Sequence, residues 1–190
     1  SRYDVRGNLI AVVDAHGRDA FTYTYDLRNQ ALRIDNIDAG LRTSVHDAAG
    51  NLIEYRDSKG SLVLRRYDAL NRLIELWARD NDQPDNLLTL RENLVYGVDM
   101  EVSLAANTLG RLIIHYDEAG VLHFERYDFK GNLTEKVRQV IADSAIAAGW
   151  TADWSALDAE DVVDPTRFEI STQFDALNRA TQLIYPRDVE

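Results

Sequence analysis

The sequence contains no cysteine and only 3 prolines and 1 methionine in 190 residues. Without cysteine there is no disulfide, no thiol nucleophile and no cysteine-ligated zinc site. No apolar run approaches the roughly 20 residues that a membrane-spanning helix needs. We therefore expect no membrane insertion and no fold that depends on covalent cross-links.

Positive charge is also scarce, with 21 Lys and Arg against 32 Asp and Glu and a formal net charge of -11. An acidic surface repels phosphate, so a nucleic-acid partner is not expected. Hydrophobic residues make up 45% of the chain and charged residues 28%, which is ordinary for a soluble globular protein. The length allows one domain or two small ones.

A repeated pair of residues is the main feature of the sequence. Asp is followed three residues later by Gly or Asn at nine places. At the first position of a type I turn, Asp can accept a hydrogen bond from the backbone two residues on, and the fourth position must be left-handed, which Gly and Asn tolerate. Each pair therefore predicts a β-hairpin with a three-residue loop. The pairs are Asp4/Gly7, Asp14/Gly17, Asp26/Asn29, Asp47/Gly50, Asp57/Gly60, Asp68/Asn71, Asp117/Gly120, Asp128/Gly131 and Asp175/Asn178.

The residues that flank each turn predict a hydrophobic pair across the two strands. In such a hairpin the residue before Asp faces the fifth residue after it. The first place is aromatic in Tyr3, Tyr25, Tyr67, Tyr116, Tyr127 and Phe174. The second place is leucine in Leu9, Leu52, Leu62, Leu73, Leu122 and Leu133. An aromatic ring facing an aliphatic side chain stabilises a hairpin by about 0.2–1 kcal/mol.

The spacing of the turns predicts the fold. Turns recur every 10 to 12 residues, and the longer gap between Asp26 and Asp47 predicts one further turn near Asn36. No crossover helix fits between turns, so neighbouring strands must be antiparallel. We predict a mainly β fold, a curved and twisted antiparallel meander of hairpins with one or two short α-helices inserted. The chain opens in the middle of this pattern, so we expect it to be part of a larger protein.

Two interruptions divide the repeat into five segments. The expected segments are a β-strip at 1–76, an insertion at 77–110 with an acidic loop and a short helix, hairpins at 111–134, a helical and Trp-containing insertion at 135–170, and a final strand pair at 171–190. The first helix would have Asp99 as N-cap and Gly110 just past its end. The spacing of Val137, Val140 and Ile141 predicts the second helix over 135–148.

Few residues are candidates for a catalytic, metal-binding or ligand-binding site. None of the four His has a partner at metal-ligand spacing, and the acidic loop at 80–86 lacks the spacing of a calcium loop. A hydrolase would need two carboxylates facing each other about 5–10 Å apart, whereas turn capping accounts for the repeated Asp residues. We therefore predict no catalytic residue, no cofactor and no metal. Trp150 and Trp154 form either a sugar-stacking platform or a cover for the edge of a sheet.

The units at 3–9, 67–73 and 127–133 share the pattern Tyr-Asp-x-x-Gly/Asn-x-Leu and resemble the tyrosine-aspartate (YD) repeats of the RHS family. The stretches 115–143 and 174–179 are most similar to the B component of tripartite ABC-type insecticidal toxin complexes. This resemblance implies a strip of β-sheet that spirals into a hollow shell around a C-terminal toxin polypeptide. The family's self-cleaving protease site lies beyond the repeats, and no residue here matches it.

The resemblance implies a non-enzymatic structural segment of an RHS-repeat toxin shell, in a bacterial protein that is secreted or lies on the cell surface. Its partners would be the rest of the RHS chain, other toxin-complex subunits and the enclosed toxin polypeptide. Open strand edges also predict self-association of the chain. The alternative is a β-rich surface module that binds carbohydrate or a cell-surface partner through Trp150 and Trp154.

Overall fold

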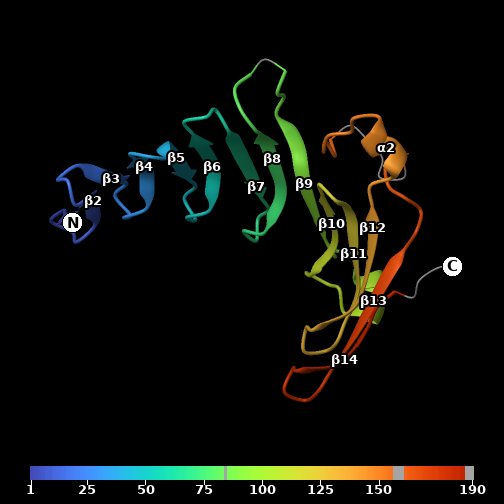
Figure 1. Cartoon of the computed structure of the whole chain (residues 1–190). Coiled ribbons are helices and arrows are strands. Elements are labelled where there is room, and N and C mark those ends of the chain that lie inside the picture. Colours follow the sequence, from blue (N-terminus) through green and yellow to red (C-terminus); the bar gives the residue numbers. More distant parts are fainter. Residues whose placement is uncertain (84, 156–160, 187–190) are drawn as a thin grey trace. The chain divides into compact units, whose positions relative to one another are not determined.

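The computed structural model describes residues 1–83, 85–155 and 161–186. The protein is mainly β, with two short helices among the described residues, and it divides into two compact units, Ser1–Leu88 and Thr89–Glu190 (Figure 1). In each unit the strands form an antiparallel meander in which sequence neighbours pair, as predicted. No helix in the described ranges is long and apolar enough to cross a membrane.

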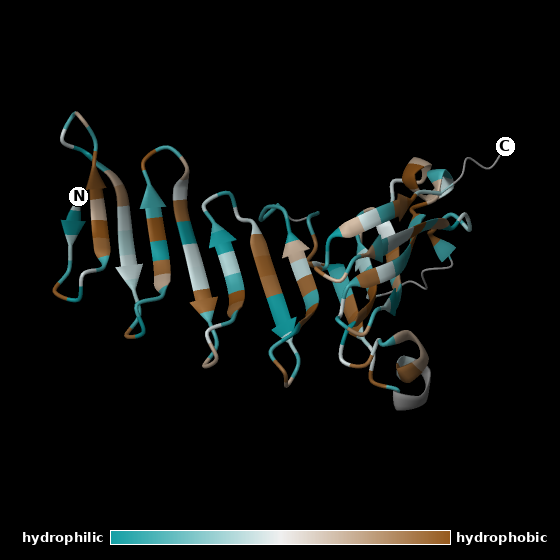
Figure 2. Ribbon diagram, turned by 90° about the horizontal axis from the view of Figure 1, so that it is seen from below, coloured by the Kyte–Doolittle hydropathy of each residue, from teal (hydrophilic) through white to brown (hydrophobic). Residues whose placement is uncertain are grey.

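The first unit is a single layer of strands (Figure 2). The chain reverses after every strand, and the additional turn expected near Asn36 is present, because Asn36 pairs with Gly40 across it. The strands are β1 (Arg2–Tyr3), β2 (Leu9–Val13), β3 (Asp19–Tyr25), β4 (Ala31–Asn36), β5 (Gly40–His46), β6 (Leu52–Asp57), β7 (Leu62–Tyr67) and β8 (Leu73–Arg79).

The two faces of the first unit differ in chemistry because side chains alternate along a strand. One face, called here the aromatic face, carries Phe21, Tyr23 and Tyr25, whose successive ring centroids lie 6.2 and 6.4 Å apart. The strand register places Tyr55 of β6 on the same side. The opposite face, called here the charged face, carries the ion pairs Arg56–Glu54 and Arg66–Glu75 together with Arg33 and Asp35, and the register also places Leu64 and Trp77 on it.

The second unit contains six strands and both helices. Its elements are β9 (Thr89–Tyr96), α1 (Met100–Ala106), β10 (Leu112–Asp117), β11 (Gly120–Tyr127), β12 (Leu133–Val140), α2 (Asp143–Ala147), β13 (Phe168–Phe174) and β14 (Ala180–Ile184).

The hydrophobic core of this unit forms where the chain after β12 folds back over the sheet. The Trp154 backbone N–H donates to the Leu90 carbonyl at 3.0 Å, and the Trp154 ring lies 5.2 Å from that of Tyr116. Beneath this cover, Val121 and Val137 are each 2% exposed. Both belong to central strands, so the most deeply buried side chains lie between the sheet and the covering segment.

The predicted helix over 135–148 is wrong in its first half. Residues up to Val140 belong to β12, and the helix extends only over Asp143–Ala147. The cause is the hairpin turn at Asp128, which sends the chain back as a strand on which Leu133 faces Tyr127 and Val137 faces His123.

The first predicted helix is present and begins directly after Asp99. It ends earlier than expected, because Asn107 already has a left-handed backbone with φ of 55°, three residues before Gly110. The strand that precedes this helix within the insertion is β9. The outer boundaries of the five segments stay predictions.

Candidate functional site

The repeated feature of the molecule is one turn, present in the same form at eight of the nine predicted places. At Asp68, a carboxylate oxygen accepts the backbone N–H of Leu70 at 2.8 Å and that of Arg72 at 2.9 Å. The Asn71 N–H donates to the Asp68 carbonyl at 3.0 Å. The same bonds occur at Asp4, Asp14, Asp26, Asp47, Asp57, Asp128 and Asp175.

The left-handed backbone lies where the turn requires it. The φ angle is 60–62° at the asparagines and 79–96° at the glycines of these eight turns. The asparagines are Asn29, Asn71 and Asn178, and the glycines are Gly7, Gly17, Gly50, Gly60 and Gly131. These positions therefore take the two residue types that adopt positive φ at low cost.

The residue before each of these Asp residues faces the fifth residue after it, and a register shift accompanies this pairing at every one of these turns except that of Asp57. The aromatic pairs are Tyr3 with Leu9, Tyr25 with Ala31, Tyr67 with Leu73, Tyr127 with Leu133 and Phe174 with Ala180. The remaining pairs are Val13 with Asp19, His46 with Leu52 and Arg56 with Leu62.

The ninth turn, at Asp117, differs from the prediction. Asp117 pairs directly with Gly120, so the loop has two residues, and Tyr116 faces Val121 instead of Leu122. Gly120 starts β11 with φ of 130°, and a side-chain carbon there would lie 2.2 Å from the Gln139 carbonyl oxygen. Glycine is needed at this position for close approach of the neighbouring strand.

The electrostatics of the turn carboxylates argue against acid–base chemistry. The Asn8 amide lowers the pKa of Asp4, and the Arg72 backbone N–H lowers that of Asp68. Burial is the largest single influence on the pKa of Asp117 and acts to raise it, but hydrogen bonds from Arg138 at 2.8 and 2.5 Å, the Ala119 backbone N–H and the charge of Arg138 together outweigh burial, and the pKa is lowered. A carboxylate held ionised is an acceptor of hydrogen bonds and a poor general acid.

The tyrosine of the repeat has a second role that the sequence did not reveal. The Tyr25 hydroxyl donates to the Leu9 carbonyl at 2.8 Å, so it reaches back toward the preceding turn at the same edge. Tyr67 donates to Leu52 at 3.1 Å, and Tyr127 donates to Leu112 at 2.8 Å. The hydroxyl explains why tyrosine stands at these three places, whereas packing against leucine would also be met by phenylalanine.

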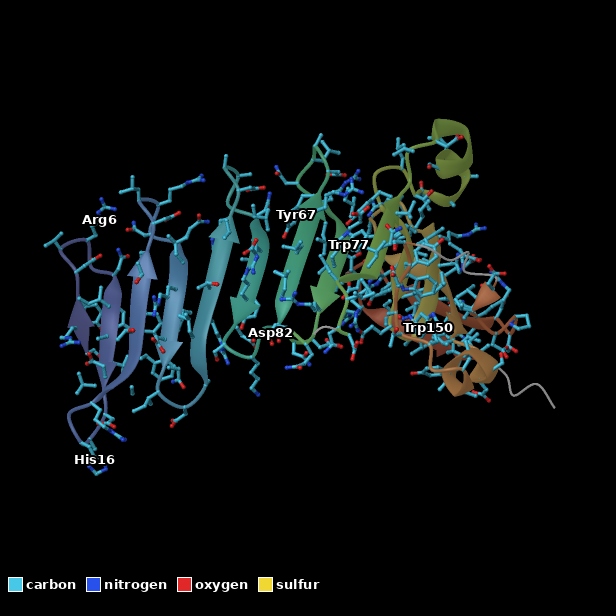
Figure 3. The ribbon with its side chains drawn as sticks, turned by 90° about the horizontal axis from the view of Figure 1, so that it is seen from above. Arg6, His16, Tyr67, Trp77, Asp82 and Trp150 are labelled. Carbon is cyan, nitrogen blue, oxygen red and sulfur yellow. The ribbon has the colours of Figure 1, made fainter. Side chains whose placement is uncertain are left out.

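The two tryptophans do not form an open platform. Trp154 is 8% exposed, and its indole N–H donates to the Asp117 carbonyl at 3.2 Å. The Trp150 ring stands edge-on to it, with centroids 5.7 Å apart, and Figure 3 shows Trp150 among the side chains of the second unit. Trp150 lines a cavity of about 550 Å³ with Arg91 and Glu118. The pair covers the sheet, and this packing does not favour a sugar-stacking surface.

The histidines and the acidic loop form no metal site within the described ranges, where no group of three His, Asp or Glu side chains comes together. His115 contacts Glu92 at 3.0 Å and faces Leu122, so it lies on the opposite face from His123, the next residue on β11. In the acidic loop, the Asn81 side chain accepts the Gln83 N–H at 2.9 Å, which makes it a turn cap.

Comparison with known proteins places this fold. No family model and no curated protein matches the chain. Among solved structures, the crystal structure of TcdB2-TccC3 matches with a TM-score of 0.85 and 20% identity, over 97% of this chain and 9% of that chain. The TcdB2-TccC3-Cdc42 crystal structure gives 0.84 and 20% identity, with the same coverage. The Photorhabdus luminescens Tc holotoxin pore gives 0.85 and 20% identity, again with 97% and 9% coverage. The chain therefore has the fold of a stretch of these Tc toxin-complex chains, in agreement with its resemblance to the RHS-repeat family.

Proposed function

We propose that the chain is a non-enzymatic structural segment of an RHS-repeat toxin shell that encapsulates a C-terminal toxin polypeptide. The observation that carries this proposal is the turn repeated at eight places, in which each Asp carboxylate accepts two backbone N–H groups of its own turn. Such carboxylates bend the chain and are not available to a substrate. The fold match to Tc toxin chains over 97% of this chain supports the same conclusion.

The two faces of the first unit suit a wall. The aromatic face has no covering layer within the described part of this unit, and Phe21 there is 37% exposed. The charged face carries ion pairs such as Arg66–Glu75. We propose that the aromatic face meets the enclosed polypeptide and the charged face meets solvent, since apolar surface left in water is costly.

The partners proposed are the rest of a longer secreted or cell-surface bacterial chain, other toxin-complex subunits and the enclosed toxin. All five residues of β14 are exposed. A strand with one open edge can pair with a further strand, either of the longer chain or of a second copy. Light scattering of the 190-residue chain should detect association that grows with concentration, and a strict monomer at high concentration would contradict self-association.

The shell function is tested in the complete parent protein by limited proteolysis of its C-terminal polypeptide. We expect the polypeptide to be protected in the parent protein and to become sensitive when Asp47 and Asp68 are replaced together by Ala. Asp38→Ala is the matched control, because Asp38 is an exposed loop residue that caps no turn. Equal sensitivity of the polypeptide in the parent and in the double variant would refute encapsulation by this wall.

The carbohydrate-binding alternative is tested with a glycan array. Under the structural proposal the chain binds no glycan above background. Binding that Trp150→Ala abolishes, in a protein that keeps its circular dichroism spectrum, would replace the structural proposal with a binding module.

A further inference from the structure

Turns at the same edge of the sheet are joined through side-chain amides. Because the chain reverses after each strand, every second turn lies at the same edge, and Figure 3 shows Arg6 of one turn and His16 of the next at opposite edges of the first unit. The Asn8 amide, in the turn that begins at Asp4, donates to the Asn29 side-chain oxygen at 2.9 Å. Asn29 is the left-handed residue of the next turn at that edge.

The same bond occurs twice more. The Asn51 amide donates to the Asn71 side-chain oxygen at 3.0 Å. The Asn132 amide donates to that of Asn178, also at 3.0 Å. In every case the donor follows a glycine in its own turn, and the acceptor is the asparagine that takes the place of glycine in the other turn. All three turn asparagines at this position are therefore acceptors.

Each donor amide is held in place by its own turn. Asn8 also donates to the second carboxylate oxygen of Asp4 at 2.9 Å, and Asn51 does the same with Asp47 at 2.9 Å. The Asp thus orients the amide so that its other hydrogen points at the neighbouring turn. A preorganised donor loses less conformational entropy when it forms a bond.

We propose that the choice between glycine and asparagine at the fourth turn position is a pairing code, in which a Gly-Asn turn recognises an Asn turn two strands away. Asn29, Asn71 and Asn178 are positioning residues that clip four consecutive strands into one block. The blocks are β1–β4, β5–β8 and β11–β14. The inference concerns how turns are joined, so it holds or fails independently of the shell function.

The junction between the first two blocks is built differently. The Arg28 guanidinium donates to the Ala48 carbonyl at 2.6 Å, and the Gln30 amide donates to the Gly50 carbonyl at 3.4 Å. Both acceptors are backbone carbonyl oxygens, so these hydrogen bonds do not depend on which side chain stands in the following turn. The code therefore joins turns within a block, and the junction between β4 and β5 is joined without it.

The competing explanation is that asparagine is present only because it tolerates positive φ. The variant Asn71→Gly separates the two explanations. Glycine adopts a φ near the observed 60° more freely than asparagine, so tolerance alone predicts an unchanged or more stable turn. The pairing code predicts a loss, because glycine has no side-chain acceptor for the Asn51 amide.

The experiment is amide hydrogen exchange on the 190-residue chain. With Asn71→Gly, we expect the Ala49 and Asn51 backbone amides in the partner turn to exchange about fivefold faster, as for loss of one hydrogen bond. Leu70→Ala is the control within the same turn, because this side chain is 70% exposed at the tip. The control should leave the exchange rates of the Ala49 and Asn51 amides unchanged. If there is no pairing code, Asn71→Gly should leave these rates unchanged as well.

A double-mutant cycle gives a second measurement of the same bond. Asn51→Ala and Asn71→Gly should each accelerate exchange, and the double variant should be less affected than the product of the two effects. Effects that multiply fully, or a partner turn that exchanges at the same rate or more slowly in Asn71→Gly, would overturn the proposal.

Discussion

Replacing Tyr127 with phenylalanine removes one hydroxyl group from a residue that is only 9% exposed. That hydroxyl donates to the Leu112 carbonyl at 2.8 Å, and the ring keeps its place beneath the Arg111 guanidinium, 5.1 Å from the ring centroid. The loss is therefore one buried hydrogen bond, which costs about 1 kcal/mol in free energy of unfolding. For a unit of this size the midpoint of thermal unfolding should fall by about 4–8 °C.

The assay is thermal unfolding followed by tryptophan fluorescence in a Trp77→Phe background, because Trp150 and Trp154 then report on the second unit alone. Tyr185→Phe is the matched control, since Tyr185 lies in the same unit, is 65% exposed, and its hydroxyl has no hydrogen-bond partner in the part of the chain that the structure describes. The control should leave the midpoint unchanged. An unchanged midpoint in Tyr127→Phe would refute the role given to the hydroxyl.

Three further predictions concern single positions. Gly60→Ala should lower the free energy of unfolding in urea more than Gly17→Ala does. Both glycines have φ near 80°, where a side chain costs about 1–2 kcal/mol, but only at Gly60 would the new carbon also lie 2.7 Å from a neighbouring backbone atom. Equal effects of the two substitutions would contradict this reasoning. In the folded chain, the ion pair with Arg138 acts to lower the pKa of Asp117. The stability that this pair adds is therefore present above the unfolded-state pKa of about 3.9 and is lost as the pH falls through the lower folded-state pKa. The stability difference between Asp117→Asn and the parent chain should accordingly shrink in urea titrations from pH 5 to pH 2, and a constant difference would contradict the pairing. Trp154→Ala should cost about 3–5 kcal/mol by leaving a cavity in the core of the second unit, and a near-native urea midpoint would contradict its burial.

Most of the fold could be predicted because the turn is local. The pattern at Asp68 and Asn71 specifies its own backbone within five residues, and the partner strands follow from chain reversal. The helix over 135–148 failed for the opposite reason. Val137 and Val140 fit helical spacing, but the hairpin at Asp128 makes this segment a strand. Residues three apart then face opposite sides, so Val137 is buried and Val140 is exposed.

The joining of turns could not be predicted from any one repeat. Asn8 and Asn29 lie 21 residues apart, and Asn132 and Asn178 lie 46 apart, across an insertion. Within a single repeat, the presence of asparagine at the left-handed position is fully explained by its tolerance of positive φ. The acceptor role becomes visible only when the strand order brings two turns together.

Within each compact unit, the strict pairing of a strand with its sequence neighbour constrains how such a protein can change in length. Adding one strand would reverse the direction of everything after it and move each later turn to the opposite edge. Adding two strands, about 21 residues, keeps every later turn at its own edge and every later side chain on its own face. Duplication or loss in even numbers of strands is therefore the change that this architecture tolerates, and growth by whole hairpins needs no new core.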